Sequence, residues 1–477
     1  MIIIILIVSL ILRLISINQS LWLDEAINVN NAANLDFKTL IFKYSLGDFH
    51  PPLYHAILKT WILIFGNSEI AVRLPSVIFG VVTVYVTYLI GKKLFEEKTA
   101  LIAATLLATA PLHIYYSQEA RMYSLAAMLT AMSVYFFISL LKPDKLIYWI
   151  GFIISMTLML YTDYLPYLMV PILIIYSFLN RKNISKRTLT TFIPAYVAIA
   201  ILISPWLFVF QKQLSVGLSA AAASPAWAQV VGTPDIKSFS ISFVKFTIGR
   251  ISINNDFTYA LIFTPIALFT AFLLVFSFFR ISKQRSIIWY WFILPILLGY
   301  VLGYLIPIFA YFRFLFTLPA LYLIWASSIN TINWTPLIRT LLGMALAINL
   351  ISTTIYFANP KFQRENWRGA VSYVLENSTN NSIVLFESNY TTGPFDYYNR
   401  NNIRAEGALN DFNPDQEKVK QRVKTLTQEK NKVYLFQYLS QITDPQGIVF
   451  EQLTKLGFNN TSTKDFNGVG FVYEFKK

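Results

Sequence analysis

The chain has 477 residues, of which 55% are hydrophobic and only 13% are charged, and its formal net charge is +14. Soluble globular proteins carry about 25% charged residues, so this composition excludes an ordinary soluble enzyme. Cysteine is absent and histidine occurs three times, which excludes disulfides, thiol catalysis and zinc sites built from cysteine. We attribute the positive charge to a membrane environment and expect no nucleic-acid partner.

About eleven apolar segments of roughly 17–24 residues are long enough to cross a bilayer. The first, at 1–17, lacks a basic leading stretch and a small-residue cleavage site, so we predict a span there rather than a signal peptide. The sequence therefore predicts a polytopic α-helical membrane protein. The other spans are expected at about 70–91, 99–115, 122–141, 145–161, 164–180, 188–210, 257–279, 287–306, 314–330 and 337–357.

The connections between these segments alternate in charge. One set is short and basic, and contains Lys92, Lys142, Arg181, Arg280 and Arg339. The positive-inside rule assigns such connections to the cytoplasm. The N-terminus is then cytoplasmic, and the longer, chemically richer connections lie on the outer face of the plasma (inner) membrane. An odd number of spans also leads the C-terminus outside.

The composition becomes that of a small water-soluble domain after the last span. About 120 residues suffice for an independent core. We therefore predict a transmembrane domain at 1–357 and an extracytoplasmic α/β domain at 358–477. Its predicted elements are helices at Asn366–Asn377 and about 414–430, and strands at Ser382–Glu387, Lys432–Leu439 and Phe471–Phe475.

Two adjacent carboxylates, Asp24 and Glu25, directly follow the first span. An ionisable residue at a membrane interface is costly unless it is solvated or paired, so such residues are candidate functional groups. A pair of carboxylates can supply a general base together with a metal ligand or hydrogen-bond partner. The alternative is that Asp24 only caps the helix that follows.

The same outer loop ends with Asp48, His50 and two prolines. The prolines fix the backbone direction, which would hold His50 near the lipid headgroups, where it can bind a phosphate or a metal. The alternative is a rigid turn leading into an interfacial helix at about 53–65. His55, on that helix, is the weaker candidate.

Three shorter outer turns carry further candidate substrate-binding residues. Glu119 and Arg121 stand at a span end, where the guanidinium suits a phosphate or, alternatively, an ion pair between spans. Tyr161 and Asp163 share another turn, where tyrosine is also typical of a membrane anchor. Arg313 is a lone charge at a span end, so it either reaches the headgroups or faces a polar cavity.

Motifs for nucleotide chemistry are missing from the sequence. There is no G-x-x-x-x-G-K-[ST] phosphate loop and no strand-associated G-x-G-x-x-G, which leaves an ATP-driven pump and a dinucleotide-binding enzyme unsupported. The cytoplasmic connections are too short for a nucleotide-sugar domain, whereas the outer connection at 211–256 is long enough to cover a substrate cavity. A reaction at the outer face would use a sugar activated on a lipid phosphate.

Four short motifs occur in a characteristic order, at Leu21–Glu25, His50–Leu53, Ala71–Ser76 and Glu119–Tyr123. In this order they resemble the GT-C glycosyltransferases of the protein-O-mannosyltransferase and lipid A aminoarabinose transferase type, a group described as glycosyltransferase family 39-like. The resemblance extends over about 1–330. It implies a GT-C fold, a sugar donor on a polyprenyl phosphate, and inverting transfer to a protein, glycolipid or lipid-linked glycan.

The resemblance also implies roles for individual residues. Asp24 corresponds to the general base or acceptor-binding carboxylate, with Glu25 as its neighbour. His50 is expected near the donor phosphate or the acceptor. Arg121 and Arg313 are expected to bind the lipid phosphate and compensate its charge as it leaves.

The sequence departs from that family at Asp163, where many relatives carry a histidine, so no role is transferred to this residue. A divalent metal ion is a candidate cofactor, with Asp24, Glu25, Asp48 and His50 as its possible ligands. A single histidine among carboxylates favours oxygen-rich coordination.

Two other classes of function remain as alternatives. A glycolipid transporter or flippase would use the same arginines to bind headgroups, although we find no repeated halves in the sequence. A membrane scaffold would bind a partner through its C-terminal domain, which leaves the polar outer motifs unexplained. We expect the glycosyltransferase.

Overall fold

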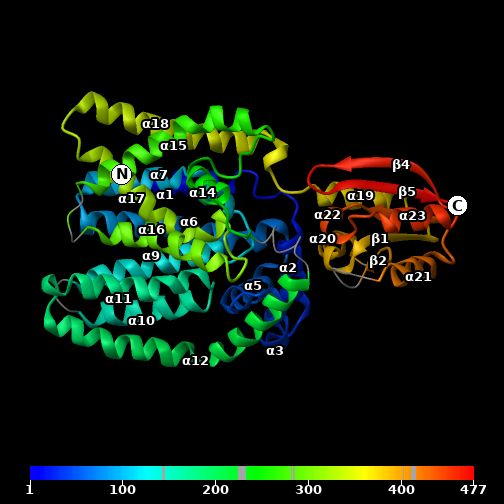
Figure 1. Cartoon of the computed structure of the whole chain (residues 1–477), viewed down its shortest axis with the longest axis horizontal. Helices are drawn as coiled ribbons and strands as arrows, with labels where there is room; N and C mark the ends of the chain where they lie inside the picture. Colours follow the sequence, from blue (N-terminus) through cyan, green and yellow to red (C-terminus); the bar gives the residue numbers. More distant parts are fainter. Residues whose placement is uncertain (142–144, 224–231, 281, 283–284, 401, 410–414) are drawn as a thin grey trace.

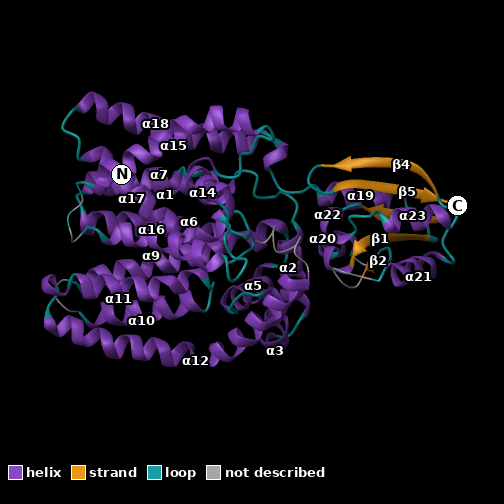
Figure 2. Cartoon of the chain, viewed as in Figure 1, coloured by secondary structure: helices purple, strands orange, loops and turns teal. Residues whose placement is uncertain are grey.

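The computed structural model describes residues 1–141, 145–223, 232–280, 282, 285–400, 402–409 and 415–477. A bundle of helices occupies one side of the molecule, and an α/β unit stands at one end of that bundle (Figures 1 and 2). Lys142, one of the basic residues assigned to the cytoplasm, lies outside the described residues.

The bundle contains helices at every one of the predicted apolar segments. In chain order, its helices are α1 (Ile2–Leu14), α2 (Leu23–Asn34), α3 (Phe37–Thr39), α4 (Ser45–Asp48), α5 (Leu53–Phe65), α6 (Glu69–Leu94), α7 (Glu97–Ala108), α8 (Pro111–Ser117), α9 (Tyr123–Leu140), α10 (Leu146–Leu160), α11 (Met169–Leu179), α12 (Lys186–Ala223), α14 (Ile236–Ile248), α15 (Asp256–Phe278), α16 (Ile287–Gly303), α17 (Leu318–Asn330) and α18 (Thr335–Ala358).

Fewer helices than predicted qualify as spans by length and composition. Among the described residues, 6 helices are long and apolar enough to cross a membrane, or up to 7 if α7 and α8 form one broken span. The other predicted spans correspond to shorter apolar helices, namely α1, α10, α11 with its preceding turn, and α16. A total of eleven spans therefore stays a prediction.

The predicted span at 99–115 is not one straight helix. α7 and α8 meet at an angle of 60°. Pro111 is the first residue of α8, where its missing N–H is tolerated, and its ring prevents α7 from continuing. Glu119, which follows α8, contacts Arg364 in the segment that leads from α18 to the α/β unit.

The predicted connection at 211–256 is largely helical. α12 continues to Ala223, well beyond the predicted span end at 210, and α14 (Ile236–Ile248) follows. A fall in hydropathy marks where a chain leaves the apolar region, but it does not break a helix. In the sequence no proline follows Pro205 until Pro225, so α12 has no strong stop signal in between.

The C-terminal α/β unit, residues 367–476, is built around a mixed five-stranded sheet in the order β2-β1-β3-β5-β4. β1 pairs in parallel with β2 and β3, whereas β5 is antiparallel to β3 and β4. Its elements are α19 (Trp367–Asn377), β1 (Ser382–Ser388), α20 (Gly393–Asn399), β2 (Ala405–Leu409), α21 (Gln416–Thr427), β3 (Lys432–Phe436), α22 (Ser440–Thr443), α23 (Ile448–Lys455), β4 (Asn459–Phe466) and β5 (Gly470–Lys476).

Both faces of this sheet are covered, because its central strands are apolar throughout. Val384 and Phe386 pack with Trp367 of α19 on one face. Ile383 and Leu385 pack on the other face with residues of α21 and α23. Alternate side chains of a strand point to opposite faces, so the run SIVLFE supplies two cores at once.

Helix α2 joins the bundle to the α/β unit and lies between them in Figure 1. The Asn30 side chain donates a hydrogen bond to the Gly393 carbonyl at 2.9 Å, and the Leu21 amide donates to the Tyr398 hydroxyl at 2.9 Å. The loop before α2 and the first turn of α2 thus sit at this junction, and the predicted functional residues gather there.

A candidate active site at the end of the bundle

Asp24 lies in the first turn of α2, and its side chain is 37% exposed. Trp22 occupies the N-cap position, and no side chain caps the helix. The interpretation of Asp24 as a helix cap is therefore wrong. The positive end of the helix dipole favours the carboxylate at this position, which still remains open to solvent and ligands.

Arg121 is the link between Asp24 and Asp48. Its Nη2 lies 3.5 Å from Oδ2 of Asp24, and its Nη1 lies 3.4 Å from Oδ1 of Asp48. The guanidinium is almost fully buried, and its Nε has no hydrogen-bond partner among the described residues. Its long contacts and free Nε leave Arg121 able to bind a further anion.

Asp48 is the centre of a network that holds Arg121. Its Oδ2 lies 3.0 Å from Nδ1 of His50 and 3.0 Å from Nε2 of His55, and Tyr44 donates to its Oδ1 at 3.3 Å. Burial opposes ionisation of Asp48, but the two imidazoles and Arg121 outweigh it and keep the pKa of Asp48 well below its ordinary value. Asp48 is a fixed negative charge.

The turn that carries His50 is anchored from a distant helix. Phe49 adopts the left-handed conformation, with φ of 60°, which ends α4 and turns the chain towards the two prolines. Gln213 of α12 donates to the His50 carbonyl at 3.2 Å, and Tyr164 donates to the Gln213 side chain. The extended α12 thus takes part in fixing the site, as part of the region expected to cover it.

Glu25 points away from Asp24 and is fully buried. Arg73 of α6 donates to Oε1 through Nε at 2.9 Å and to Oε2 through Nη2 at 2.5 Å, and the Ala120 amide donates to Oε1 at 2.7 Å. Burial would raise the pKa of Glu25, but Arg73 more than compensates and lowers it. This carboxylate pairs two segments of the bundle and is closed to a ligand.

Glu119 is also buried in an ion pair, although neither of its carboxylate oxygens has a hydrogen-bond partner among the described residues. Its Oε2 lies 2.7 Å from Nη1 of Arg364, a residue that follows α18. Burial raises the pKa of Glu119 despite that positive charge. Arg364 also donates to the Tyr115 hydroxyl at 2.5 Å, as does Arg250 at 2.8 Å. The sequence analysis missed Arg364, because nothing in its neighbourhood indicates a partner far back in the chain.

Of the three remaining candidates, Asp163 and Arg313 face the region around His50, whereas Tyr161 does not. Asp163 is buried, which raises the pKa of its carboxyl group, and the positive charges of His50 and Arg313 oppose that rise. The Nε of Arg313 is buried with no hydrogen-bond partner among the described residues. Tyr161 instead donates to the Leu202 carbonyl of α12 at 2.9 Å and joins two helices.

Glu365 is a further acid that the sequence analysis did not identify. Trp367 donates to it at 2.7 Å, and Tyr438 of the α/β unit donates at 3.0 Å. Burial raises the pKa of Glu365 to about 7, and the negative charge of Asp24 adds to this effect. The signal available was its place immediately before the helix predicted at Asn366–Asn377.

A divalent metal ion stays a prediction, and the structure does not group its candidate ligands among the described residues. Among the described residues, no group of three or more histidine, aspartate or glutamate side chains could hold an ion. The oxygens of Glu25 are taken by Arg73 and a backbone amide, and those of Asp48 by Arg121, Tyr44 and the imidazoles. Carboxylates paired in this way do not fit a divalent cation.

A family model described as dolichyl-phosphate-mannose-protein mannosyltransferase matches residues 49–208. This segment includes His50, Arg121 and Asp163, and ends within α12. No curated protein matches the sequence.

Solved structures resemble the chain over almost its whole length. ArnT from Cupriavidus metallidurans is 12% identical with a TM-score of 0.57, over 99% of this chain and 97% of that one, and has also been solved bound to undecaprenyl phosphate. The oligosaccharyltransferase AglB from Archaeoglobus fulgidus, in complex with an inhibitory peptide and a dolichol-phosphate, is 13% identical with a TM-score of 0.55, over 99% and 73%. The arabinofuranosyltransferase AftD from Mycobacteria is 13% identical with a TM-score of 0.51, over 100% and 41%.

Proposed function

We propose that this protein, which has the fold of the GT-C membrane glycosyltransferases, transfers a sugar from a polyprenyl phosphate to an acceptor at the outer face of the membrane. The observation that carries the proposal is that the Nε atoms of Arg121 and Arg313 are both buried and have no hydrogen-bond partner among the described residues. Buried unsatisfied donors are costly, and an anionic ligand would satisfy them. An exposed carboxylate, Asp24, stands beside one of them at 3.5 Å.

A phosphate fits these donors better than a neutral ligand would. Guanidinium groups bind phosphate oxygens through paired, charge-assisted hydrogen bonds. Structures in the same fold are described with undecaprenyl phosphate and with dolichol-phosphate, which supports a lipid phosphate as the ligand here. We assign Arg121 and Arg313 to that phosphate.

The reaction proposed is a single displacement with inversion. The acceptor oxygen attacks the anomeric carbon, a new C–O bond forms, and the bond from that carbon to the phosphate oxygen breaks. The lipid phosphate leaves with the bonding electrons, and Asp24 takes the acceptor proton or orients the acceptor. Arg121 and Arg313 stabilise the negative charge that develops on the phosphate.

The network around Asp48 serves this chemistry by positioning. Arg121 shares its charge between Asp24 and Asp48, and the imidazoles of His50 and His55 keep Asp48 in place. Side chains held in this way need little reorganisation when the phosphate arrives. We assign His50 and His55 to this network, because both ring contacts lead to Asp48.

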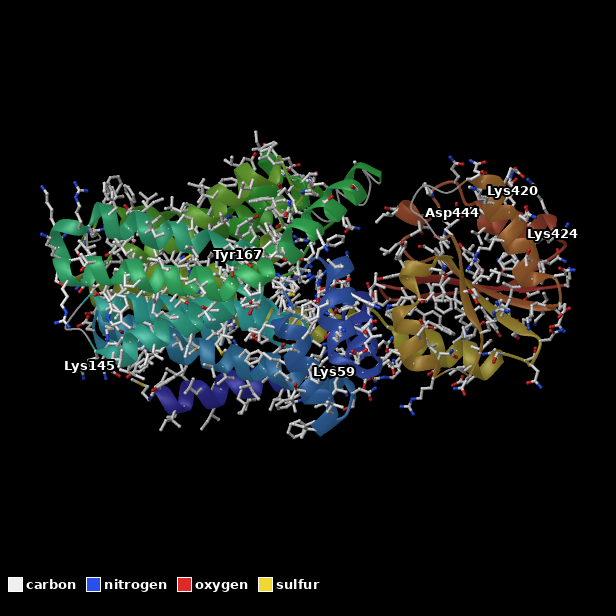
Figure 3. The ribbon with its side chains drawn as sticks, turned by 90° about the horizontal axis from the view of Figure 1, so that it is seen from below. Lys59, Lys145, Tyr167, Lys420, Lys424 and Asp444 are labelled. Carbon is white, nitrogen blue, oxygen red and sulfur yellow. The ribbon has the colours of Figure 1, made fainter. Side chains whose placement is uncertain are left out.

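We place the N-terminus in the cytoplasm and the α/β unit outside. Lys145, from one of the basic connections, lies at the end of the bundle away from the α/β unit (Figure 3). The positive-inside rule and this separation agree with a site that opens towards the α/β unit. The acceptor would be a protein, a glycolipid or a lipid-linked glycan.

The experiment is a transfer assay in membranes that contain the full-length protein and labelled polyprenyl-phosphate sugars. We expect label in an acceptor fraction for the wild type and very little for Asp24→Asn. Asp256→Asn is the matched control, because Asp256 is an exposed acid that pairs with the equally exposed Lys237. Equal transfer by wild type and Asp24→Asn would contradict the role of Asp24. Movement of glycolipid across vesicles without formation of a glycosidic bond would instead support a transporter.

A further inference from the structure

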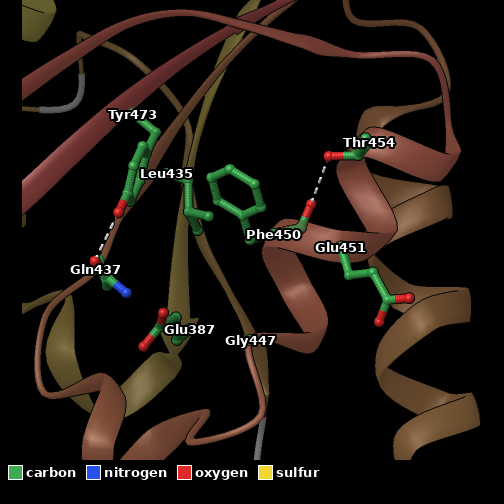
Figure 4. Close-up of a pocket in the computed structure, with 8 residues that line it drawn as sticks. All are labelled: Glu387, Leu435, Gln437, Gly447, Phe450, Glu451, Thr454 and Tyr473. Atoms are coloured by element: carbon green, nitrogen blue, oxygen red, sulfur yellow. Dashed lines mark hydrogen bonds between the residues drawn. The ribbon is translucent and has the colours of Figure 1, made fainter.

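A cavity of about 460 Å³ opens in the C-terminal α/β unit, apart from the site described above. Figure 4 shows the side chains that line it. They come from the ends of β1 and β3, from β5 and from α23, and are Glu387, Leu435, Gln437, Gly447, Phe450, Glu451, Thr454 and Tyr473.

The cavity lies where the topology of the sheet changes direction. From β1 the chain passes to β2 on one side, and then returns to form β3 on the other side of β1. Open parallel sheets bind ligands in the crevice at the carboxyl ends of such strands. Glu387 is the penultimate residue of β1 and Gln437 directly follows β3, so both stand at this edge.

Glu387 is an acid held in the wall of the cavity with little exposure, 4%. Thr443 donates to its Oε2 at 3.0 Å, and the described residues provide no further hydrogen bond to the carboxyl group. Burial, with a contribution from Asp444, raises the pKa of Glu387 to about 8. At neutral pH the group is therefore protonated, and it can both donate and accept a hydrogen bond.

Two neighbours add neutral polar groups that point the same way. The Tyr473 hydroxyl donates to Oε1 of Gln437 at 2.9 Å, as the dashed line in Figure 4 shows. This contact orients the side-chain amide of Gln437 and leaves its two N–H donors for a ligand, since no described residue accepts from them. The cavity wall thus offers a carboxylic acid, an amide and a hydroxyl group.

An aromatic surface faces these polar groups. Phe450 of α23 is 37% exposed, and its ring centroid lies 5.1 Å from that of Tyr473 at a steep angle. The other large apolar side chains of α23 pack inwards, whereas the outer side of the Phe450 ring has no packing role. It can cover the apolar face of a ring-shaped ligand.

Anions are disfavoured in this cavity. The lining residues include no lysine or arginine, and the one charged group at the rim, Glu451, is paired with Lys455 at 2.6 Å. At the start of α23 Asp444 already accepts from the amides of Ile448 at 3.0 Å and of Val449 at 2.9 Å. The lining therefore suits a ligand that is neutral, rich in hydroxyl groups and apolar on one face.

We propose that this cavity is a second binding site, which takes a short neutral carbohydrate. Glu387 and Gln437 would exchange hydrogen bonds with sugar hydroxyl groups, and Phe450 would stack on the C–H face of a sugar ring. The inference rests on the α/β unit alone and holds whether or not the bundle transfers a sugar.

The test is direct binding of the full-length protein, in lipid nanodiscs, to immobilised oligosaccharides. The probes are neutral gluco-, manno- and galacto-oligosaccharides, with a sulfated oligosaccharide for comparison. We expect binding to at least one neutral probe. Phe450→Ala and Gln437→Ala should each weaken it about tenfold or more, the loss that removing one ring contact or one buried hydrogen-bond partner commonly causes.

Three further variants keep the test decisive. Tyr390→Ala removes another exposed ring, 56% exposed and outside the cavity, and should leave binding unchanged. Glu387→Gln keeps a donor and an acceptor and should also bind. Asp24→Asn should bind as the wild type does, which separates this site from the proposed transferase site.

Several outcomes would overturn the proposal. They are absence of binding to every neutral probe, preference for the sulfated probe, binding as tight as that of the wild type by Phe450→Ala and Gln437→Ala, or loss of binding in Asp24→Asn. Hydrogen exchange at the amides of β1 and β3 checks that the variants remain folded.

Discussion

Asp24 and Glu25 are neighbours in the sequence, yet they belong to two different regions of the molecule. Asp24 is 37% exposed and touches Arg121 at 3.5 Å, whereas Glu25 is fully buried and is held by two hydrogen bonds from Arg73. Successive residues of an α-helix point about 100° apart, so α2 turns one acid towards Arg121 and solvent and the other into the bundle. We call these the open cluster (Asp24, Asp48, Arg121) and the closed pair (Glu25, Arg73).

The difference separates chemistry from structure within a single motif. A carboxylate whose oxygens are all taken stabilises the fold but cannot accept a proton from a substrate. A carboxylate with one long contact can accept a proton. It needs a neighbouring side chain that holds it in place without occupying both of its oxygens. Variants in the two regions should therefore fail in different ways.

The largest effect is expected in the open cluster. Asp24→Asn should lower the turnover of transfer by about 10²–10⁴-fold, the usual contribution of a general base. Its thermal stability should match the wild type, because the exposed side chain makes little packing. Transfer rates and melting curves of purified protein measure both. A matching fall in stability would assign Asp24 to the fold instead.

The closed pair should behave in the opposite way. Glu25→Gln removes the charge that compensates Arg73 and should cost about 3–5 kcal/mol of stability, as breaking a buried pair commonly does. The measurement is the yield of folded protein and its melting temperature in detergent. Glu69→Gln is a suitable control, because Glu69 pairs with Arg368 at a more exposed place. Normal stability together with lost transfer would contradict this assignment.

A smaller effect is expected at the proposed phosphate contact. Arg313→Gln should raise the KM for the lipid-linked donor by about 10–100-fold, because one charge-assisted hydrogen bond contributes roughly 1.5–3 kcal/mol. Folding should be unaffected, since the Nε of Arg313 has no partner to lose within the described part of the chain. Donor titrations check this, and an unchanged KM would remove Arg313 from the site.

The smallest effect on transfer is expected in the α/β unit, where stability depends on pH. The pKa of Glu387 is raised from 4.5 to about 8, so the folded state holds a proton that the unfolded state has released between these values. Stability should fall as the pH rises through this window and level off above it. Glu387→Gln should remove the slope and stabilise the protein at pH 8.

Hydrogen exchange of β1 and β3 at several pH values measures this effect locally. Glu417→Gln on α21 is the control, since Glu417 is exposed and should leave the slope intact. If the stability of Glu387→Gln and of the wild type depended on pH in the same way, the pKa of Glu387 would be at its ordinary value.

Much of the fold follows from patterns that act locally. Long apolar runs in the sequence predicted a helix at each expected span, and short apolar runs predicted β1, β3 and β5. β4 was missed because it is a polar edge strand, NNTSTKDF, with mostly exposed side chains and no alternation of apolar residues. Its partner β5 defines it through backbone hydrogen bonds, which composition does not record.

The candidate site was predicted in part for a related reason. Asp24, His50 and Arg121 were predicted from motifs near span ends, and the structure brings them together around Asp48. Arg364 and Glu365 were missed, since their partners lie far away in the chain and their own surroundings are ordinary. Which acid of Asp24 and Glu25 is open also depends on the rotation of α2 against its neighbours, a property of packing.

The pairing of Glu119 with Arg364 has a consequence for how the protein is made. Glu119 enters the membrane early in synthesis, between α8 and α9, whereas Arg364 is translated only after the last helix of the bundle. Until then a buried acid has no positive partner from that segment, so it keeps a proton or water. The bundle therefore reaches its final charge state only after the segment that follows α18 has been made.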